Sequence, residues 1–384
     1  MKKIIIICTI FLFSGCTVNE ALNITRAAIS KDPALAFKTI LQSKTLGYII
    51  NPKNLTNDIN SINTFIEKVS SVWGKENAKT PKQKEYVKYM QDYKSRALID
   101  FDKGIVTVET INTENVNNSL KNAIITTLLL PDDPRAVDLF GTSEVKLGAT
   151  PYLLGEVKDD QDKNIRSEWR ANRFAHFLVK NQLKQKIILK DGKNLTVSYI
   201  NIPMVKDHAS IRIAKFQPLV NDYAEKFNVS KNLIYAIIKT ESNFNQFAVS
   251  SEGALGLMQI VPTSAGKDAY KYIKGNDWTP SREYLFDAKN NIELGSAYIQ
   301  MLKSKYLDGI YNEISKEYCV ISAYNTGSGN VLKTFSENKS EAKELINKKT
   351  ALDVYNTLRT KLPYEETRRY LKKVVTNKKE FVNL

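Results

Sequence analysis

Residues 228–260 read NVSKNLIYAIIKTESNFNQFAVSSEGALGLMQI, and the rest of the chain is organised around this stretch. Ser230 is a good N-cap residue, and Val229 and Ile234 occupy the two positions of a hydrophobic staple. Apolar residues then recur at helical spacing, which predicts a helix from Ser230 to Glu241 with one apolar face. Glu241 follows Ile234 by seven residues and therefore belongs to that apolar face.

Glu241 is an unusual residue to find on the apolar face of a helix. Burial disfavours the charged carboxylate, and the last turn of a helix carries partial negative charge that disfavours it further. Both effects raise the pKa, and a carboxylic acid that stays protonated near neutral pH can donate a proton to a leaving oxygen. The alternative is a Glu241 side chain that turns outward or pairs with a lysine, which is the commoner situation for an isolated helical glutamate.

Four motifs occur in a fixed order along the second half of the chain. They are ESNF at 241–244, GALGLMQIVP at 253–262, AYNTGSG at 323–329 and YEETRRYLKKV at 364–374. Each is weak alone, but together they resemble the signature set of the soluble-type lytic transglycosylases, which share a helical, goose-lysozyme-like domain. The upstream half resembles one member of that family at YVKYMQDYKSRALIDFDKGIVTVETI (86–111) and TLLLPDDPRAVDLFG (127–141). The resemblance thus covers nearly the whole mature chain.

The length and composition are those of an ordinary globular protein with two domains. The chain has 384 residues, of which 42% are hydrophobic and 25% charged. From residue 211 onward the apolar spacing is helical almost throughout, so we expect an α+β N-terminal domain followed by an all-α lysozyme-like catalytic domain. The predicted boundaries are a signal peptide over 1–15, a tether over 16–54, the α+β domain over 55–205 and the lytic transglycosylase domain over 206–384.

Two pairs of strand-like segments lie in the N-terminal half of the chain. Residues 97–101 and 105–110 flank a glycine-containing turn, and residues 186–189 and 195–199 flank another, so each pair predicts a hairpin. The helical stretches between them favour an antiparallel sheet with helices on one face. Two more helices are predicted before the first hairpin, over 61–73 and 81–90.

The first sixteen residues, MKKIIIICTIFLFSGC, predict export and a lipid anchor. A basic start precedes ten apolar residues, a run too short to span a bilayer. The ending resembles a bacterial lipobox, in which Cys16 is acylated and becomes the new N-terminus, although Phe13 stands where Leu is usual. Several acyl chains, at about 0.8 kcal/mol per buried methylene, would anchor the protein stably. The residue after Cys16 is Thr17 rather than the Asp that signals retention in the inner membrane, so we expect an outer-membrane lipoprotein facing the periplasm. The alternative is an ordinary secretory peptide with an incidental cysteine.

The charge and the few cysteines and histidines limit the classes of partner. A net charge of +15 favours an anionic partner such as the carboxylates of peptidoglycan stems, and the chain contains no nucleic-acid-binding motif. Cys8 leaves with the signal peptide, and Cys319 is expected to be a small buried hydrophobic residue. His176 and His208 are each expected to be structural, and we expect neither a metal nor a cofactor.

The resemblance implies a reaction that uses a single carboxyl group. Ordinary glycosidases use two carboxylates, but no second carboxylate occupies a matching motif position here. In the implied mechanism Glu241 protonates the bond between N-acetylmuramate and N-acetylglucosamine. It then accepts the proton of the sugar's own 6-hydroxyl, which closes a 1,6-anhydro ring without water.

The resemblance also implies substrate-binding roles for several residues. Ser250 matches a serine that holds the muramyl substituents, and Gln259 and Val261 match positions that line the groove. Tyr324 matches a tyrosine whose hydroxyl can orient the catalytic acid. Asn325 matches a residue that can hydrogen-bond the sugar.

Three further residues near these motifs have less specific roles. Glu366 matches a carboxylate that shapes the site from behind, and an ion pair with Arg368 or Arg369 is an equal alternative. Gly256 belongs to a glycine-containing segment that is expected to let the backbone approach a sugar. Tyr370 is assigned to the core.

Two other function classes remain open. The first is a hydrolase of the goose-type lysozyme kind, in which Glu252 or Glu366 would be the second carboxylate; its products would have reducing rather than anhydro ends. The second is a non-catalytic lipoprotein that binds glycan in the same groove. An acid on a buried helix face at Glu241 argues against a pure binding protein, which has no need of one.

Overall fold

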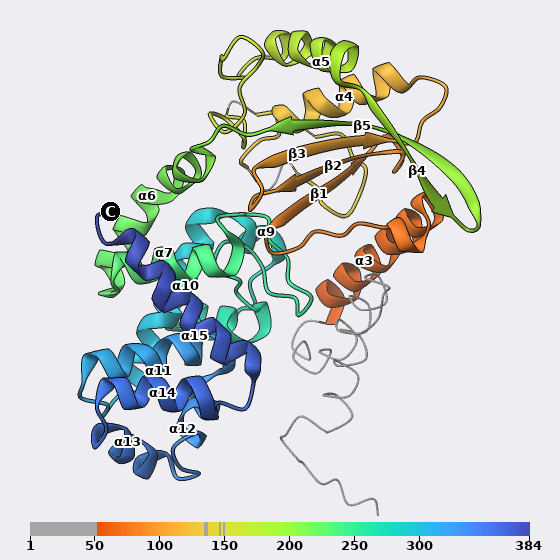
Figure 1. Cartoon of the computed structure of the whole chain (residues 1–384). Helices are drawn as coiled ribbons and strands as arrows, with labels where there is room; N and C mark the ends of the chain where they lie inside the picture. Colours follow the sequence, from red (N-terminus) through yellow and green to blue (C-terminus); the bar gives the residue numbers. More distant parts are fainter. Residues whose placement is uncertain (1–51, 134–136, 146, 149) are drawn as a thin grey trace, which may run out of the picture.

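The computed structural model describes residues 52–133, 137–145, 147–148 and 150–384, with the backbone alone over residues 52–61. The predicted signal peptide, Cys16 and nearly all of the predicted tether lie outside the described residues. Figure 1 shows a half that contains the sheet above a half made of helices. The predicted fold class, an α+β N-terminal domain followed by an all-α domain, is confirmed.

The N-terminal domain is built on one five-stranded antiparallel sheet with strand order β1-β2-β3-β5-β4. Both predicted hairpins are present, and they meet where β3 pairs with β5, with Val108 opposite Ile200. Figure 1 shows α4 and α5 above the sheet and α3 below it, where the Trp73 ring lies 6.3 Å from that of Tyr89. The elements are α3 Pro52–Trp73, η2 Lys75–Asn77, β1 Glu85–Met90, β2 Ser95–Asp100, β3 Ile105–Thr110, α4 Val116–Leu128, α5 Glu168–Gln182, β4 Lys184–Lys190 and β5 Lys193–Pro203.

The prediction of a helix over residues 81–90 is wrong. Strand β1 occupies its second half and pairs with β2, Val87 lying opposite Leu98. Every residue from 86 to 90 is buried, so the alternation of polar and apolar residues that marks a strand is absent. Lys88 is the most misleading residue in this segment, because a lysine is expected to be exposed. Its amine is instead buried and donates to the carbonyl oxygens of Asp138 and Gly141. Burial lowers the pKa of Lys88 to about 8.

The C-terminal domain is helical, as predicted. Ser230 caps α7 by accepting from the Leu233 amide at 3.4 Å, and Asp287 caps α10 by accepting from the Asn290 amide at 2.9 Å. Helix α10 ends at Met301 and is followed by a short π-helical turn, η5 Leu302–Tyr306. The elements are α6 His208–Phe227, α7 Lys231–Ser242, η4 Pro262–Gly266, α8 Lys267–Lys274, α9 Arg282–Phe286, α10 Ala288–Met301, η5 Leu302–Tyr306, α11 Glu313–Thr326, α12 Ser328–Lys333, α13 Lys339–Asn347, α14 Ala351–Lys361, α15 Glu365–Lys378 and η6 Lys379–Phe381.

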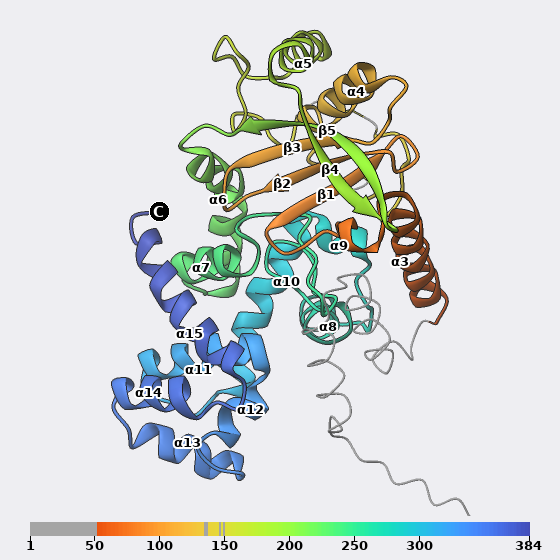
Figure 2. The same ribbon diagram turned by 45° about the vertical axis from the view of Figure 1, so that its right-hand side comes forward.

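Helix α7 is the centre of this helical domain. Ile234, Ile237 and Ile238 have no exposed surface, which confirms the predicted apolar face. Helix α15 lies beside α7 in both views, although the two are far apart in the sequence (Figures 1 and 2). Within the described part of the chain, no helix is long and apolar enough to cross a membrane.

Candidate active site

Glu241 lies in the last turn of α7, and its side chain is 9% exposed. Its pKa is raised to about 8, mainly by burial and to a smaller extent by the negative charges of Glu366 and Glu252. Among the described residues, no lysine or arginine pairs with the Glu241 carboxyl. The structure therefore confirms the predicted burial and the predicted direction of the pKa shift, and this carboxyl is protonated at neutral pH.

Tyr370 lies beside Glu241, and the sequence did not reveal that these two residues are neighbours. The Tyr370 hydroxyl interacts with the Glu241 carboxyl and lowers the pKa of that acid. Burial, and then the charge of Glu241, raises the pKa of Tyr370 well above its usual value. No described group meets strict hydrogen-bond geometry with this hydroxyl, so the contact is loose. Tyr370 is buried, as predicted, but it is part of the site; Glu366, four residues earlier on α15, was the available signal for this helix face.

Tyr324 has a different partner from the one predicted. Its hydroxyl donates to the Met258 carbonyl at 2.8 Å, which ties α11 to the loop of the GALGLMQIVP motif. Burial raises the pKa of Tyr324 well above its usual value, and the charge of Glu241 adds to the shift. Tyr324 therefore lies close enough to respond to Glu241, while its hydrogen bond fixes the neighbouring loop.

Asn325 is held in place by helix α15. Its side-chain oxygen accepts from the Thr367 hydroxyl at 2.6 Å, and Thr367 is buried on α15. This bond links the AYNTGSG motif of α11 to the YEETRRYLKKV motif. Two motifs that are far apart in the sequence therefore form one corner of the site.

Ser250 closes the loop that follows the catalytic helix. Its buried hydroxyl accepts from the amides of Glu252, at 3.1 Å, and Ala254, at 2.9 Å. Gln259 is also used within this loop, because its side-chain nitrogen donates to the carbonyl oxygens of Ala248, at 3.2 Å, and Gly256, at 3.0 Å. Val261 is half-buried at the end of the loop.

Gly256 is required by protein packing. It has a φ of +75°, and a Cβ there would come within 2.3 Å of the Asn291 side chain and of the Leu285 carbonyl. Asn291 is fully buried on α10, accepts from the Met258 amide at 2.8 Å and donates to the Leu255 carbonyl at 2.9 Å. The predicted reason for this glycine, a close approach of the backbone to a sugar, is replaced by the close approach of Asn291. Sequence reasoning missed Asn291, because nothing local distinguishes it from an exposed asparagine.

The two candidate second carboxylates, Glu366 and Glu252, are both solvent-exposed. Their charges act on Glu241 by raising its pKa. Arg369, one of the two arginines considered as a partner for Glu366, forms an ion pair with Glu365 at 2.8 Å. Arg368, the other, donates to the Leu362 carbonyl.

Metal-ligating side chains do not gather anywhere in the described ranges of the chain. Cys319 is a free, buried thiol, as predicted, and burial raises its pKa to about 12. The site that the structure does assemble consists of Glu241, two tyrosines, Asn325 and the 250–261 loop.

A helical domain with this motif set and a buried acid at the end of α7 defines a lytic transglycosylase domain, and residues 218–347 match the family model described as Transglycosylase SLT domain. Residues 48–215 match the model described as Membrane-bound lytic murein transglycosylase C, N-terminal domain. The chain belongs to the membrane-bound lytic murein transglycosylase C family. The predicted family is thereby confirmed, and its members are lyases that act on peptidoglycan.

Relatives with this name occur in Yersinia. The chain is 42% identical over 318 residues to Membrane-bound lytic murein transglycosylase C of Yersinia pestis (strain Pestoides F), covering 83% of this chain and 87% of the relative. The same values hold for the protein of that name from Yersinia pseudotuberculosis serotype O:1b (strain IP 31758).

Two solved structures are similar to part of this chain. One is an inactive mutant of the lytic transglycosylase Slt from Pseudomonas aeruginosa, with 26% identity and a TM-score of 0.32. The other is the 70 kDa soluble lytic transglycosylase from Escherichia coli, with 26% identity and a TM-score of 0.33. Each similarity covers 42% of this chain and 23% of the solved chain.

Proposed function

We propose that this protein cleaves the β-1,4 bond between N-acetylmuramate and N-acetylglucosamine in peptidoglycan, and leaves 1,6-anhydromuramyl ends. Glu241 acts first as the acid and then as the base. The observation that carries the proposal is the buried Glu241 carboxyl, whose pKa burial raises to about 8. Such a group is protonated at neutral pH and becomes a competent base once it has given up its proton.

The proposed reaction balances without water. The Glu241 proton goes to the glycosidic oxygen as the bond between that oxygen and the muramyl C1 breaks. The 6-hydroxyl of the same sugar then attacks C1, and its proton returns to Glu241. Intramolecular groups held in this way reach effective molarities of about 10⁵–10⁸ M, far above the concentration of water. Tyr370, which lowers the pKa of Glu241, helps to stabilise the carboxylate between the two steps.

The cationic centre at C1 needs stabilisation as well. The N-acetyl group of the substrate or side chains near Glu241 would supply it. We propose that the glycan is held by the residues that match the family motifs around Glu241: Ser250, Gln259, Val261, Tyr324, Asn325 and Glu366. What supports this set is that its members belong to motif segments tied to one another by hydrogen bonds, as between Asn325 and Thr367.

Digestion of purified cell wall in ¹⁸O-water, followed by mass spectrometry of the muropeptides, tests the proposal. We expect 1,6-anhydromuramyl ends with no ¹⁸O above background. Stoichiometric ¹⁸O at the new ends would mean that water attacks C1. Because the charges of Glu252 and Glu366 both act on Glu241, either carboxylate could then be the second catalytic group of a hydrolase. The variants Glu252→Gln and Glu366→Gln would show which of them is needed.

We also propose that Cys16 carries lipid and that the protein is anchored in the outer membrane, facing the periplasm. The support is the basic and apolar sequence that ends at Cys16, and the words "membrane-bound" in the names of the Yersinia relatives. The proposed organisation is a tether over 16–54, an α+β domain over 55–205 and a catalytic domain over 206–384.

Metabolic labelling with a radioactive fatty acid and membrane fractionation test the anchor. The wild-type protein should take up label and pellet with outer membranes, whereas Cys16→Ala should do neither. Wild-type protein found wholly in the soluble periplasmic fraction would contradict the proposal.

A further inference from the structure

The chain leaves the catalytic helix through an unfavourable turn. Asn243 is the C-cap of α7, with φ 48° and ψ 43°, and the next residue, Phe244, has φ 62°. Two consecutive non-glycine residues in the left-handed region are costly, above all when one is as bulky as Phe244. Backbone of this kind persists only where its surroundings hold it, and it is concentrated at functional sites. The turn begins two residues after Glu241.

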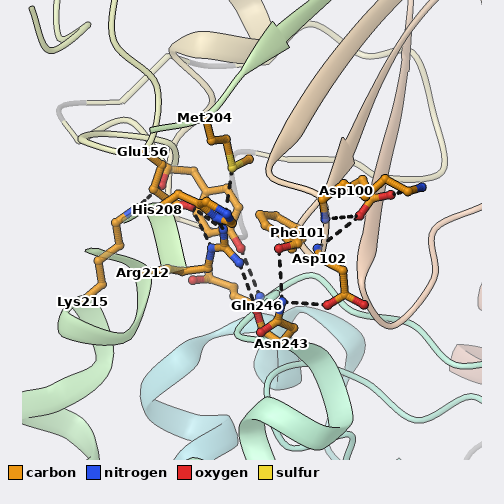
Figure 3. Close-up of polar contacts among 12 residues, drawn as sticks. Asp100, Phe101, Asp102, Glu156, Met204, His208, Arg212, Lys215, Asn243 and Gln246 are labelled. Carbon is orange, nitrogen blue, oxygen red and sulfur yellow. Dashed lines mark hydrogen bonds and ion pairs between the residues drawn. The ribbon is translucent and has the colours of Figure 1, made fainter. Parts of the chain in front are cut away.

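The groups that hold this turn include several from the N-terminal domain, as Figure 3 shows. The Asn243 side-chain nitrogen donates to the Phe101 carbonyl at 3.1 Å and to the Asp102 carboxylate at 2.8 Å. Both acceptors lie in the β2–β3 turn. From the other side, the Arg212 guanidinium of α6 donates to the Asn243 carbonyl at 3.2 Å. We refer to Arg212, Asn243, Phe101 and Asp102 as the interdomain latch.

The amide side chains that follow Asn243 make the same kind of contact. The Asn245 side-chain nitrogen donates to the Gln83 carbonyl at 3.1 Å. The Gln246 side chain donates to the Asp132 carbonyl at 2.5 Å, and its backbone amide donates to the Tyr152 hydroxyl at 3.2 Å. All three amide side chains of residues 243–246 therefore bond to the N-terminal domain.

Burying the charge of Arg212 at this domain boundary costs desolvation free energy. Arg212 is 1% exposed, pairs with Glu156 at 2.7 Å and lies 4.3 Å from the centre of the Phe101 ring. Glu156 is equally buried and also pairs with Lys215 at 2.6 Å. Buried ion pairs add little net stability over well-packed apolar residues, and their best-attested use is to specify one arrangement. A network of this kind therefore suits a boundary whose geometry must be unique.

We propose that the N-terminal domain positions the catalytic acid through the interdomain latch. Asn243, held by the β2–β3 turn and by Arg212, fixes the last turn of α7 and with it the direction of the Glu241 carboxyl. Asn243 and Arg212 are positioning residues, since they act through Glu241. The inference rests on the proposed role of Glu241, and it gives the N-terminal domain a part in the reaction.

The variant Asn243→Gly tests the latch with little change to the backbone. Glycine adopts the left-handed C-cap conformation without strain, so the helix end is preserved while the side-chain bonds to Phe101 and Asp102 are lost. Asn228→Gly is the matched control, because Asn228 caps α6 with nearly the same geometry, φ 50° and ψ 49°. We expect Asn243→Gly to lower kcat on soluble glycan chains ~10-fold, with KM within about twofold of wild type. Asn228→Gly should leave both constants unchanged.

The pH profile separates positioning from a general loss of stability. A looser helix end admits water to Glu241, which lowers the pKa of that carboxyl toward its ordinary value. The basic limb of the kcat profile should therefore move to lower pH in Asn243→Gly and stay in place in Asn228→Gly. If Asn243→Gly changes neither kcat nor the basic limb of the kcat profile, the proposal that the latch positions Glu241 is wrong.

A second pair of variants decides the matter if Asn243→Gly folds poorly. Asp102→Ala removes one acceptor at an exposed turn, whereas Asp102→Asn keeps a side-chain oxygen that can accept from Asn243. We expect kcat to fall in Asp102→Ala and to recover in Asp102→Asn. Asp102 also pairs with Lys84 at 3.3 Å, so Lys84→Met is the control for that ion pair. Equal kcat in Asp102→Ala and wild type would contradict the proposal that the latch positions Glu241. Full activity in Glu241→Gln would instead contradict the proposed function.

Discussion

The two domains bury glutamates in opposite ways. In the N-terminal domain, Glu109 is 1% exposed and pairs with Arg96 at 2.6 Å and with Lys186. Burial alone would raise the pKa of Glu109, but these two cations bring it below its usual value. In the catalytic domain, Glu241 is buried with no cation beside it among the described residues, and its pKa rises to about 8.

This difference shows what keeps a buried carboxyl protonated near neutral pH. Burial disfavours the charge in both places; the cations beside Glu109 keep that carboxyl ionised, whereas the one lowering contact of Glu241, with Tyr370, does not offset its burial. Glu109 is a fixed negative charge that links β3 to β2 through Arg96 and to β4 through Lys186. Glu241 keeps a proton that it can donate.

The largest effect should come from Glu241→Gln. The amide keeps the size of the side chain but cannot donate a proton, and general acid–base catalysis contributes about 10²–10⁴-fold. We expect cell-wall solubilisation to fall by that factor, with no loss of thermal stability. Glu365→Gln, at an exposed carboxylate of α15, should keep full activity. A Glu241→Gln protein with half the wild-type turnover would remove Glu241 from the mechanism.

The reverse behaviour is expected of Glu109→Gln. The amide leaves Arg96 buried without its counter-charge, and breaking a buried pair costs about 3–5 kcal/mol. Urea unfolding should show this loss in the free energy of unfolding, whereas Glu241→Gln should show none, because there an amide replaces a neutral acid. Glu67→Gln, at an exposed position of α3, is the control. Equal stability of Glu109→Gln and wild type would mean that the pair does not hold the sheet together.

The neighbours of Glu241 should shift the pH dependence in opposite directions. The kcat of the wild type should fall as the pH rises through about 8, where Glu241 loses its proton. Tyr370 lowers the pKa of Glu241, so Tyr370→Phe should move this basic limb to higher pH. Glu366 raises it, so Glu366→Gln should move the limb to lower pH. Shifts of the same sign in both variants, measured on soluble glycan chains, would contradict the described electrostatics.

A further effect should appear in the dependence of the free energy of unfolding on pH. The pKa of Glu241 rises from its ordinary 4.5 to about 8 on folding, so between these values the folded state binds a proton that the unfolded state has released. The free energy of unfolding should therefore fall as the pH rises through this window. Subtracting the curve of Glu241→Gln from that of the wild type isolates this contribution. A difference that grows with pH would mean that the carboxyl is charged when folded.

Local signals predicted much of the fold and the central residue of the site. The cap at Ser230, the hairpin turn at 102–104 and the apolar face of α7 depend on neighbours in sequence, and the structure confirms them. Strand β1 could not be predicted, because Lys88 is satisfied by carbonyl groups fifty or more residues away. Periodicity indicates that such a residue is polar and says nothing about where its partners lie.

The rest of the site was missed for the same physical reason. Tyr370 comes 129 residues after Glu241, and apolar spacing can place its ring in the core without showing which group its hydroxyl meets. Asn291 satisfies two backbone groups of a loop that lies more than thirty residues before it, and the carbonyl of Leu285 in α9. These contacts exist only after the helices have packed, so no local pattern encodes them.

The packing of α15 on α7 has a consequence for how the protein is made. Glu241 is synthesised long before residues 365–378, yet the hydroxyl that contacts its carboxyl belongs to Tyr370 of that later helix. A nascent chain, or one cut short by a premature stop codon, lacks this helix and its contact with Glu241. The surroundings that set the pKa of Glu241 are therefore complete only when translation has passed residue 378 and α15 has docked on α7.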